Sequence, residues 1–317
     1  MKRKTVYWPL AMALCLVLTG CSLGFKTSVA RVTAIVELQG PEYAYPLMDA
    51  TVTAGDARGT TGISGRALLA GIEQDRMHEF VVTTDFGTFP SRLYLDGNAA
   101  VELAVPLPGE INHDEFANVV FWFRSVNWRW RRGDVLWAYF DFSRSGLSTY
   151  DREAAVGQAE REFRSWLEGP GTSLRWGGIA LAANEANVVV RMVNDDAYFN
   201  RFPEDRGQNV AARGGPMAQD EEGYTIRGEI WVRADCCRFQ DGLYAHELGH
   251  VLGMGHPADL FSARTVMGYS HQVAEAGTVD RLMLQVKMHL PPGIPYNPQM
   301  AALRSAGLPE PLPTPVR

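Results

Sequence analysis

The segment 246–256, which reads HELGHVLGMGH, carries residue types at a spacing that can hold a metal ion. His246 and His250 are four residues apart, so on a helix both imidazoles project from one face. Two nitrogens so placed can bind one Zn²⁺ at roughly 2.0–2.1 Å each. Gly253 can end the helix in a left-handed conformation, after which the chain can turn and bring His256 to the same ion. Three protein ligands with one position left for water are typical of a catalytic zinc.

Glu247 lies beside the first histidine and is free to act on water instead of binding the ion. A carboxylate at this place can take a proton from water bound to the zinc and later give it to a leaving amine. We therefore expect Glu247 to be the general base of a hydrolase. The other histidines are expected to be ordinary surface or core residues: His78, His113, His271 and His289.

The residues before this segment predict strands that position it. Three apolar runs predict strands, and they cover residues 135–142, 187–193 and 224–232. The stretch between the last two runs, 196–223, is rich in Gly, Asp and Glu, so we expect a surface loop there.

Two helices are expected beside these strands. The first follows Ser148, which forms a capping box with Asp151, and it ends at the Gly-Pro pair 169–170. The second begins near Asp241 and carries the histidines. The order strand, helix, strand, strand, helix predicts an α+β fold for a domain of residues 111–290.

Residues 30–107 show short alternating apolar runs separated by turn residues, which predicts a small antiparallel β-sandwich. The runs are residues 32–38, 50–54, 80–84 and 101–105. The stretch 50–66 resembles the carboxypeptidase regulatory-like sandwich modules, and a spacer role is the expected one. After residue 290 the chain is rich in Pro, so residues 291–317 are expected to form an extended tail.

The first 20 residues have the features of a secretory leader. Three basic residues at 2–4 precede an apolar run, 10–18, that is too short to cross a bilayer. Residues 18–21, Leu-Thr-Gly-Cys, resemble the lipobox of bacterial lipoproteins, in which the cysteine becomes the first mature residue and carries acyl chains. The alternative is a plain signal peptide.

The lipobox resemblance implies a lipid anchor on Cys21, a tether of residues 21–29 and a place in the bacterial cell envelope. Ser22 directly after the cysteine implies the outer membrane where the source has two membranes.

The composition argues for a core-stabilised globular chain. Of its 317 residues 46 % are hydrophobic, which suits about two domains. The net charge is -6, and it falls to -9 without the three basic residues of the leader. An acidic chain makes nucleic acid an unexpected partner, since phosphate binding needs clustered Lys and Arg. The composition carries no signal of the oligomeric state.

The cysteines exclude a disulfide framework. Cys15 lies in the leader and Cys21 would be lipidated, which leaves the neighbours Cys236 and Cys237. Adjacent cysteines make a strained disulfide, so we expect two small, partly buried thiols. A vicinal redox pair, or a thiolate that reaches a metal, are the alternatives.

The eleven residues 246–256 resemble the signature of the metzincin zinc metalloproteases. The resemblance implies a mixed sheet, a zinc-binding helix and a methionine in a tight turn beneath the zinc. Met267 lies eleven residues after His256 and resembles that Met-turn. Tyr269 resembles the extra zinc ligand or transition-state stabiliser of the astacin and serralysin branches, with a hydrogen-bonded core Tyr as the alternative. Whether the branch is matrixin-, astacin- or serralysin-like stays open.

The expected activity is hydrolysis of internal peptide bonds in proteins or peptides, with one Zn²⁺ and with Glu247 as the base. A substrate strand is expected to pair with the sheet edge formed by residues 224–232. The alternative is a catalytically silent envelope binding or assembly lipoprotein on the same scaffold. The acidic clusters 195–196 and 220–222 offer ligands for Ca²⁺, but solvated loop charges are the expected interpretation.

Overall fold

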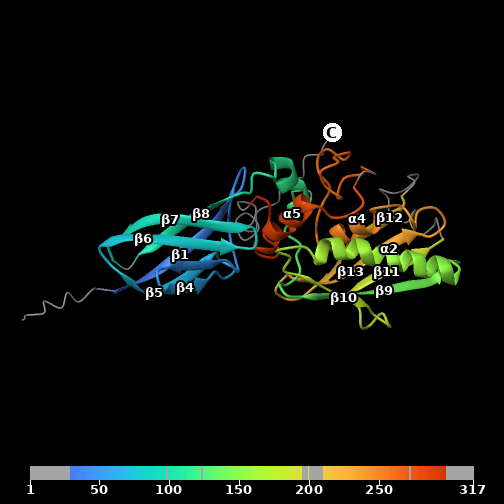
Figure 1. The fold of residues 1–317 in the computed structure, drawn as a ribbon, viewed down its shortest axis with the longest axis horizontal. Coiled ribbons are helices and arrows are strands. Elements are labelled where there is room, and N and C mark those ends of the chain that lie inside the picture. Colours follow the sequence, from blue (N-terminus) through green and yellow to red (C-terminus); the bar gives the residue numbers. More distant parts are fainter. Residues whose placement is uncertain are drawn as a thin grey trace, which may run out of the picture.

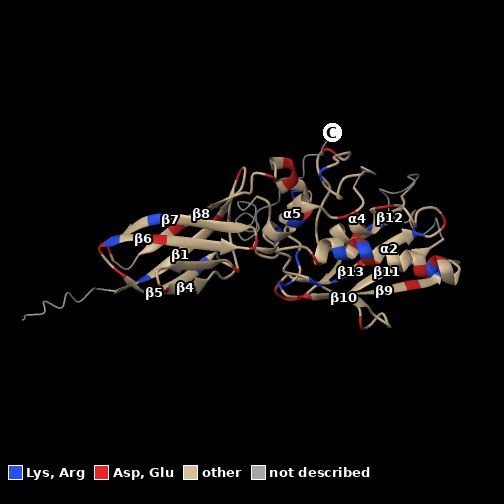
Figure 2. Ribbon diagram, viewed as in Figure 1, with Lys and Arg blue, Asp and Glu red and all other residues tan. Residues whose placement is uncertain are grey.

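The computed structural model describes residues 29–97, 99–122, 124–194, 199, 210–270 and 273–297. Two parts follow each other along the long axis of the molecule, a pair of β-sheets and an α+β part (Figure 1). Basic and acidic residues are interspersed over both parts (Figure 2). Among the described residues, no helix is both long and apolar enough to span a membrane. The leader, Cys21 and residues 298–317 lie outside the described residues, so their assignments stay predictions. The prediction of an extended tail is wrong for its first residues, 291–297, because Tyr296 is buried in the core and its N–H donates to the Ser125 carbonyl at 2.8 Å.

The first part contains eight strands in two four-stranded sheets. In one sheet β1 pairs with each of the other three, and its strands are β1 (Val29–Gln39), β2 (Ala44–Pro46), β5 (Arg66–Glu73) and β8 (Ala100–Pro106). The other sheet has the order β4-β3-β6-β7, from β3 (Thr51–Ala54), β4 (Ala57–Thr60), β6 (Arg76–Thr84) and β7 (Gly87–Leu95). Every second residue of β8 is buried, as the alternation requires. The four predicted runs are confirmed as strands. The sheets are not wholly antiparallel as predicted, because β8 pairs with β1 in parallel.

The second part is built on a five-stranded sheet with the order β10-β9-β11-β13-β12. Its strands are β9 (Val135–Arg144), β10 (Arg175–Ile179), β11 (Val188–Val193), β12 (Ala212–Gln219) and β13 (Thr225–Arg233). Only β12 runs antiparallel to its neighbour, so the sheet is mixed. The predicted strands are confirmed as β9, β11 and β13.

The structure contradicts two expectations about β12. Residues 212–219 are a strand and not a loop, and β13 lies between β11 and β12, so residues 224–232 do not form the sheet edge. The edge strands of the described sheet are β10 and β12, and β12 is the one next to β13. Its sequence, ARGGPMAQ, lacks the β-branched and aromatic residues of a strand and contains Gly-Gly and Pro. Pro is tolerated on an edge strand because no partner needs its missing N–H.

Helices α2 (Thr149–Leu167) and α4 (Leu243–Val251) confirm both predicted helices. The side chain of Ser148 caps α2 by accepting from the N–H of Asp151 at 3.1 Å. The buried Trp166 fixes the two helices together because its indole N–H donates to the Ala245 carbonyl at 2.7 Å. Helix α4 packs on β12 and β13. Helix α5 (Thr278–Met288) and the short π-helix η1 (Glu115–Val120), which pack on each other, were not predicted.

The two parts share a buried contact around His289, which is fully buried as a core residue. Its Nδ1–H donates to the Met48 carbonyl at 2.8 Å, and its Nε2 accepts from the backbone N–H of Asp85 at 3.1 Å. Arg132 completes the contact with an ion pair to Asp85 at 2.6 Å. Residues of both parts therefore belong to one continuous hydrophobic core.

Candidate metal centre

The three predicted histidine ligands converge on one point. The Nε2 atoms of His246, His250 and His256 lie 2.9–3.1 Å from one another. An ion bound at about 2.0–2.1 Å to three such nitrogens separates them by roughly 3.3 Å in tetrahedral geometry. The donor set therefore fits one Zn²⁺, and among the described residues it is the cluster able to hold a metal ion.

Backbone carbonyls fix the tautomers of the two helical ligands. The Nδ1–H of His246 donates to the Val266 carbonyl at 2.8 Å, and the Nδ1–H of His250 donates to the Met254 carbonyl at 2.8 Å. Both rings therefore turn an unprotonated Nε2 toward the shared point, which is the form that binds a metal.

Burial favours the neutral form of all three imidazole rings. Burial is the main cause that lowers the pKa of His246, His250 and His256, and repulsion from His246 adds to it at the other two. The pKa of His256 falls to about 3. Neutral imidazoles at neutral pH are available as ligands without losing a proton first.

A left-handed turn at Gly253 brings the third ligand back, as the sequence predicted. Its φ is +82°, and a Cβ there would lie 2.1 Å from the Trp128 carbonyl oxygen. The next turn is held by the N–H of Gly255, which donates to the Val119 carbonyl at 2.9 Å. A glycine is required at 253 because both the conformation and the space exclude a side chain.

Glu247 is buried, with 5 % of its surface exposed. A backbone hydrogen bond from Gly214 reaches its carboxyl group, yet Oε2 has no hydrogen-bond partner. Burial raises the pKa of this carboxyl to about 8, against the smaller opposing effects of Gly214 and Arg213. An unsatisfied carboxylate oxygen beside three converging imidazoles can accept a proton from a molecule in the cavity.

Met267 is fully buried and lies in a tight turn under the metal ligands. Its sulfur occupies the space next to Gly249, where an added Cβ would lie 2.1 Å from it. The buried Asp280 of α5 holds this turn by accepting from the Thr265 hydroxyl and from the Val266 N–H at 3.2 Å. Asp280 was not predicted, since nothing local links it to the turn.

Tyr269 is 48 % exposed, so the alternative of a core tyrosine is wrong. Its hydroxyl lies 3.4 Å from Nδ1 of His256, and its ring stacks on that of His246 at 5.4 Å. Tyr269 therefore stands beside the third ligand, and a role as zinc ligand or transition-state stabiliser stays a prediction.

A cavity of about 600 Å³ opens above the histidines. The described part of the predicted loop does not plug it, because residues 210–214 form one wall. Its other walls come from residues 240–243, from the segment after Val266 and from Trp122. Reasoning from the sequence missed Trp122 and Gly214 as parts of this site.

Glu162 of α2 orients the helix that carries the ligands. This buried carboxylate accepts from the N–H groups of Gly242 at 3.2 Å and Ala245 at 2.9 Å, in the first turn of α4. The N-terminal N–H groups of a helix have no partner within the helix, so Glu162 caps α4 from a neighbouring helix. The sequence gives no local signal for such a cap.

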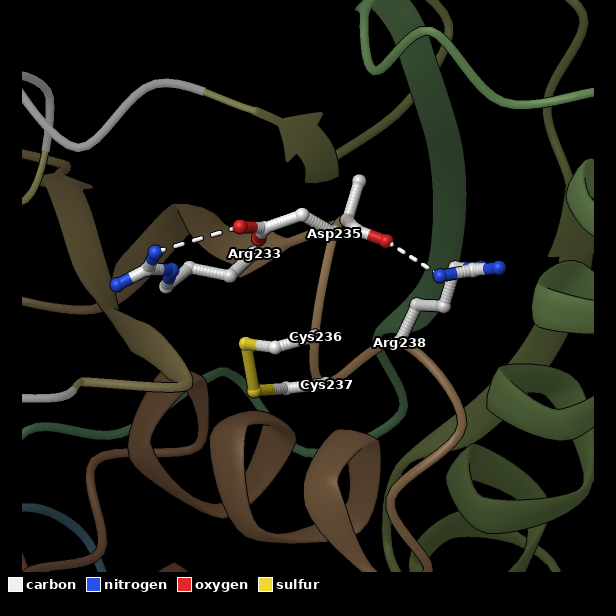
Figure 3. The surroundings of a disulfide bond; sticks show 6 residues. Arg233, Asp235, Cys236, Cys237 and Arg238 are labelled. Carbon is white, nitrogen blue, oxygen red and sulfur yellow. Dashed lines mark hydrogen bonds and ion pairs between the residues drawn. A yellow bond between two sulfur atoms is a disulfide. The ribbon is translucent and has the colours of Figure 1, made fainter.

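Cys236 and Cys237 form a disulfide in the turn between β13 and α4 (Figure 3). The expectation of two thiols is therefore wrong, and a disulfide has no thiolate to reach a metal. The turn is held on either side by an ion pair of Arg233 with Asp235 at 3.4 Å and by Arg238, whose guanidinium donates to the Ala234 carbonyl at 2.7 Å. A tight turn lets neighbouring side chains meet, which spacing alone did not reveal.

The remaining candidates behave as ordinary residues where they are described. His78 contacts the Glu73 carbonyl and His113 contacts Glu42, while His271 lies outside the described residues. Of the acidic clusters, Asp220 and Glu222 pair with Arg131 at 2.7 and 2.5 Å, and residues 195–196 lie outside the described part.

The fold and the site define an α+β protein, rich in strands, with three histidines that could hold a metal ion. No protein-family model matches the chain, and no curated protein matches it significantly.

Proposed function

We propose that this protein is a zinc-dependent endopeptidase of the metzincin kind, carried on the bacterial envelope by a lipid on Cys21. The observation that carries the proposal is the convergence of three neutral Nε2 atoms beside the unsatisfied Oε2 of Glu247, at the floor of an open cavity. The leader and the lipobox-like residues 18–21 support the location.

A Zn²⁺ held by the three histidines would act as a Lewis acid toward a carbonyl oxygen and toward water. Glu247 receives a proton at Oε2 from the attacking water and later gives it to the leaving amine. The unsatisfied oxygen of Glu247 beside the three histidines supports this role as proton acceptor.

The free edge of β12 supports a polypeptide substrate. Residues 212–214 of β12 line the cavity, and β12 pairs with β13 on one side only. An extended chain can add to such an edge through its backbone groups, and it can continue past both ends of the strand. That arrangement supports cleavage of internal bonds, because a chain paired with the edge need not end at the site.

The test uses the chain from Ser22 onward, incubated with a mixed peptide library and analysed by mass spectrometry. We expect internal cuts that disappear with a zinc chelator and return when Zn²⁺ is added back. A protein that binds one zinc per chain but cuts no peptide would instead indicate the silent binding lipoprotein.

A further inference from the structure

Trp122 is the part of the cavity wall that lies furthest in sequence from the metal ligands. It follows η1, which precedes the whole five-stranded sheet, and it is half-buried. Its ring stands edge-on to that of His250, with centroids 5.4 Å apart and planes at 75°. The indole therefore presents apolar surface beside a ligand without offering a ligand atom itself.

The backbone of Trp122 is held in a conformation that bulky residues avoid. Its φ is +48°, in the left-handed region that residues with a side chain seldom adopt. Such a conformation persists when the surroundings impose it, and it is concentrated at functional sites. The π-helix that precedes it is a second feature found at such sites.

Buried contacts hold the C-terminal end of η1, just before Trp122. The side-chain amino group of the fully buried Lys287 donates to the Val120 carbonyl at 2.7 Å and to the Asn127 side chain at 2.9 Å. The Val119 carbonyl accepts from Gly255, one residue before the third ligand. The segment that leads into Trp122 is thus hydrogen-bonded to the turn that places His256.

Two further aromatic side chains line the same cavity and are exposed. Phe261 is 77 % and Tyr269 is 48 % exposed. Apolar side chains gathered around a cleft are a feature of ligand-binding sites. Aromatic surface on this wall favours an apolar or aromatic partner through burial and ring stacking.

We propose that Trp122 is a specificity-determining residue that binds a bulky apolar or aromatic side chain of the substrate next to the scissile bond. The proposal rests on the proposed endopeptidase function and names the class of substrate: polypeptides with such a side chain at one fixed position from the cut.

The experiment compares four full-length, zinc-loaded proteins on a peptide library: the natural protein, Trp122→Gly, Trp122→Phe and Trp137→Ala. Glycine removes the ring without a left-handed penalty. Trp137, 41 % exposed on β9 and outside the cavity, controls for the loss of an indole. We expect Trp122→Gly to lose the preference and to raise KM about tenfold, with a smaller change in kcat. Trp122→Phe should keep the preference, and Trp137→Ala should match the natural protein.

A binding measurement separates this proposal from the proposed function. In a Glu247→Gln background, fluorescence anisotropy gives Kd for a peptide with one central phenylalanine and for the same peptide with alanine in its place. With Trp122 the two Kd values should differ about tenfold, and with glycine at this position they should be equal.

Each outcome decides one of the two proposals. Unchanged cleavage preference and Kd in Trp122→Gly overturn the role of Trp122 and leave the peptidase intact. Discrimination that depends on Trp122 without any cleavage supports the subsite and overturns the peptidase. Zinc content is measured for every variant; if Trp122→Gly loses zinc or fold, Trp122→Leu takes its place, and a shift from aromatic to aliphatic preference is then required.

Discussion

Among single residues, Glu247 differs from the buried Glu162 because one of its carboxylate oxygens has no hydrogen-bond partner. Glu162, equally buried, accepts hydrogen bonds on both oxygens from α4, whereas Glu247 keeps Oε2 without a partner. Burial raises the pKa of both groups. A carboxylate whose oxygens both accept hydrogen bonds from the protein stabilises the fold. A buried carboxylate oxygen without such a partner, beside a cavity, is available for proton transfer.

Glu247→Gln tests this difference. The amide keeps the shape of the side chain but accepts no proton, so turnover should fall by at least about 100-fold. Zinc binding should stay at one ion per chain, because the three imidazoles are untouched. Metal analysis and peptide cleavage measure the two quantities on the same sample. A variant that keeps both zinc and activity would remove Glu247 from the mechanism.

The disulfide gives a second prediction for single residues. A chain from Ser22 onward has only Cys236 and Cys237, so the intact protein should show no reactive thiol and the reduced, unfolded protein should show two. Thiol titration with a chromogenic reagent, before and after reduction, measures this. Two thiols without reductant would contradict the structure of this turn.

At the scale of elements, the site depends on how closely α4 approaches β12. Gly214 allows that approach, since a Cβ there would lie 2.4 Å from the Glu247 carbonyl oxygen and 3.0 Å from its Oε2. The neighbouring Gly215 points to open space, with nothing within 4 Å of an added Cβ. A side chain at Gly214 would therefore collide with α4, whereas a side chain at Gly215 would not.

Gly214→Ala should push β12 away from α4 and cost about 1–3 kcal/mol of unfolding free energy. Cleavage should fall more than tenfold because the Glu247 carboxylate and the cavity wall both move. Gly215→Ala is the matched control and should leave stability and cleavage unchanged or slightly improved. Equal effects of the two substitutions in chemical denaturation and in cleavage would refute the close-approach argument.

Glu162→Gln tests the cap on α4. The carboxylate accepts two N–H hydrogen bonds, and the NH₂ of glutamine can replace neither oxygen as an acceptor at its position. We therefore expect the unfolding free energy to fall by about 1–2 kcal/mol. Glu153→Gln is the control, because Glu153 lies on the exposed face of α2, the helix that also carries Glu162. It should change the unfolding free energy by less than about 0.5 kcal/mol. Denaturant titrations of the zinc-free proteins measure both, and equal stabilities would mean that Glu162 does not cap α4.

For the whole molecule, the β-sheets of residues 29–106 and the α+β part act as one packed body at the His289 contact. Burial opposes ionisation of Asp85, but the neighbouring side chains of His289 and Arg132 outweigh it and hold the pKa of Asp85 well below its usual value. A carboxyl whose pKa is depressed in the folded state stabilises that state above its unfolded pKa, near 4, and this stabilisation is lost as the pH falls further.

Asp85→Asn should therefore lower the unfolding free energy by about 1–2 kcal/mol at pH 7, and the difference from the natural protein should shrink below pH 4. Asp56→Asn, in the exposed turn between β3 and β4, is the control and should show no such difference. Thermal unfolding followed from pH 7 to pH 3 measures both variants. A pH-independent gap for Asp85→Asn would assign the effect to lost packing.

The sequence alone determined the features that depend on neighbours along the chain. The spacing of His246, His250 and Gly253 already defines ligands on one helical face and a turn after it, because helical geometry relates residues four apart. The strands β9, β11 and β13 and the cap at Ser148 were predictable for the same reason, since alternation and capping are local patterns.

Only the tertiary structure decided what depends on contacts between distant segments. Strand β12 has no strand-like composition and is held by its pairing with β13, and Gly214 matters only because α4 approaches it. Trp122 reaches the cavity from a segment that precedes the whole sheet. Such contacts are made by packing across the fold, where partners are selected by shape and unmet hydrogen bonds instead of by spacing in the chain.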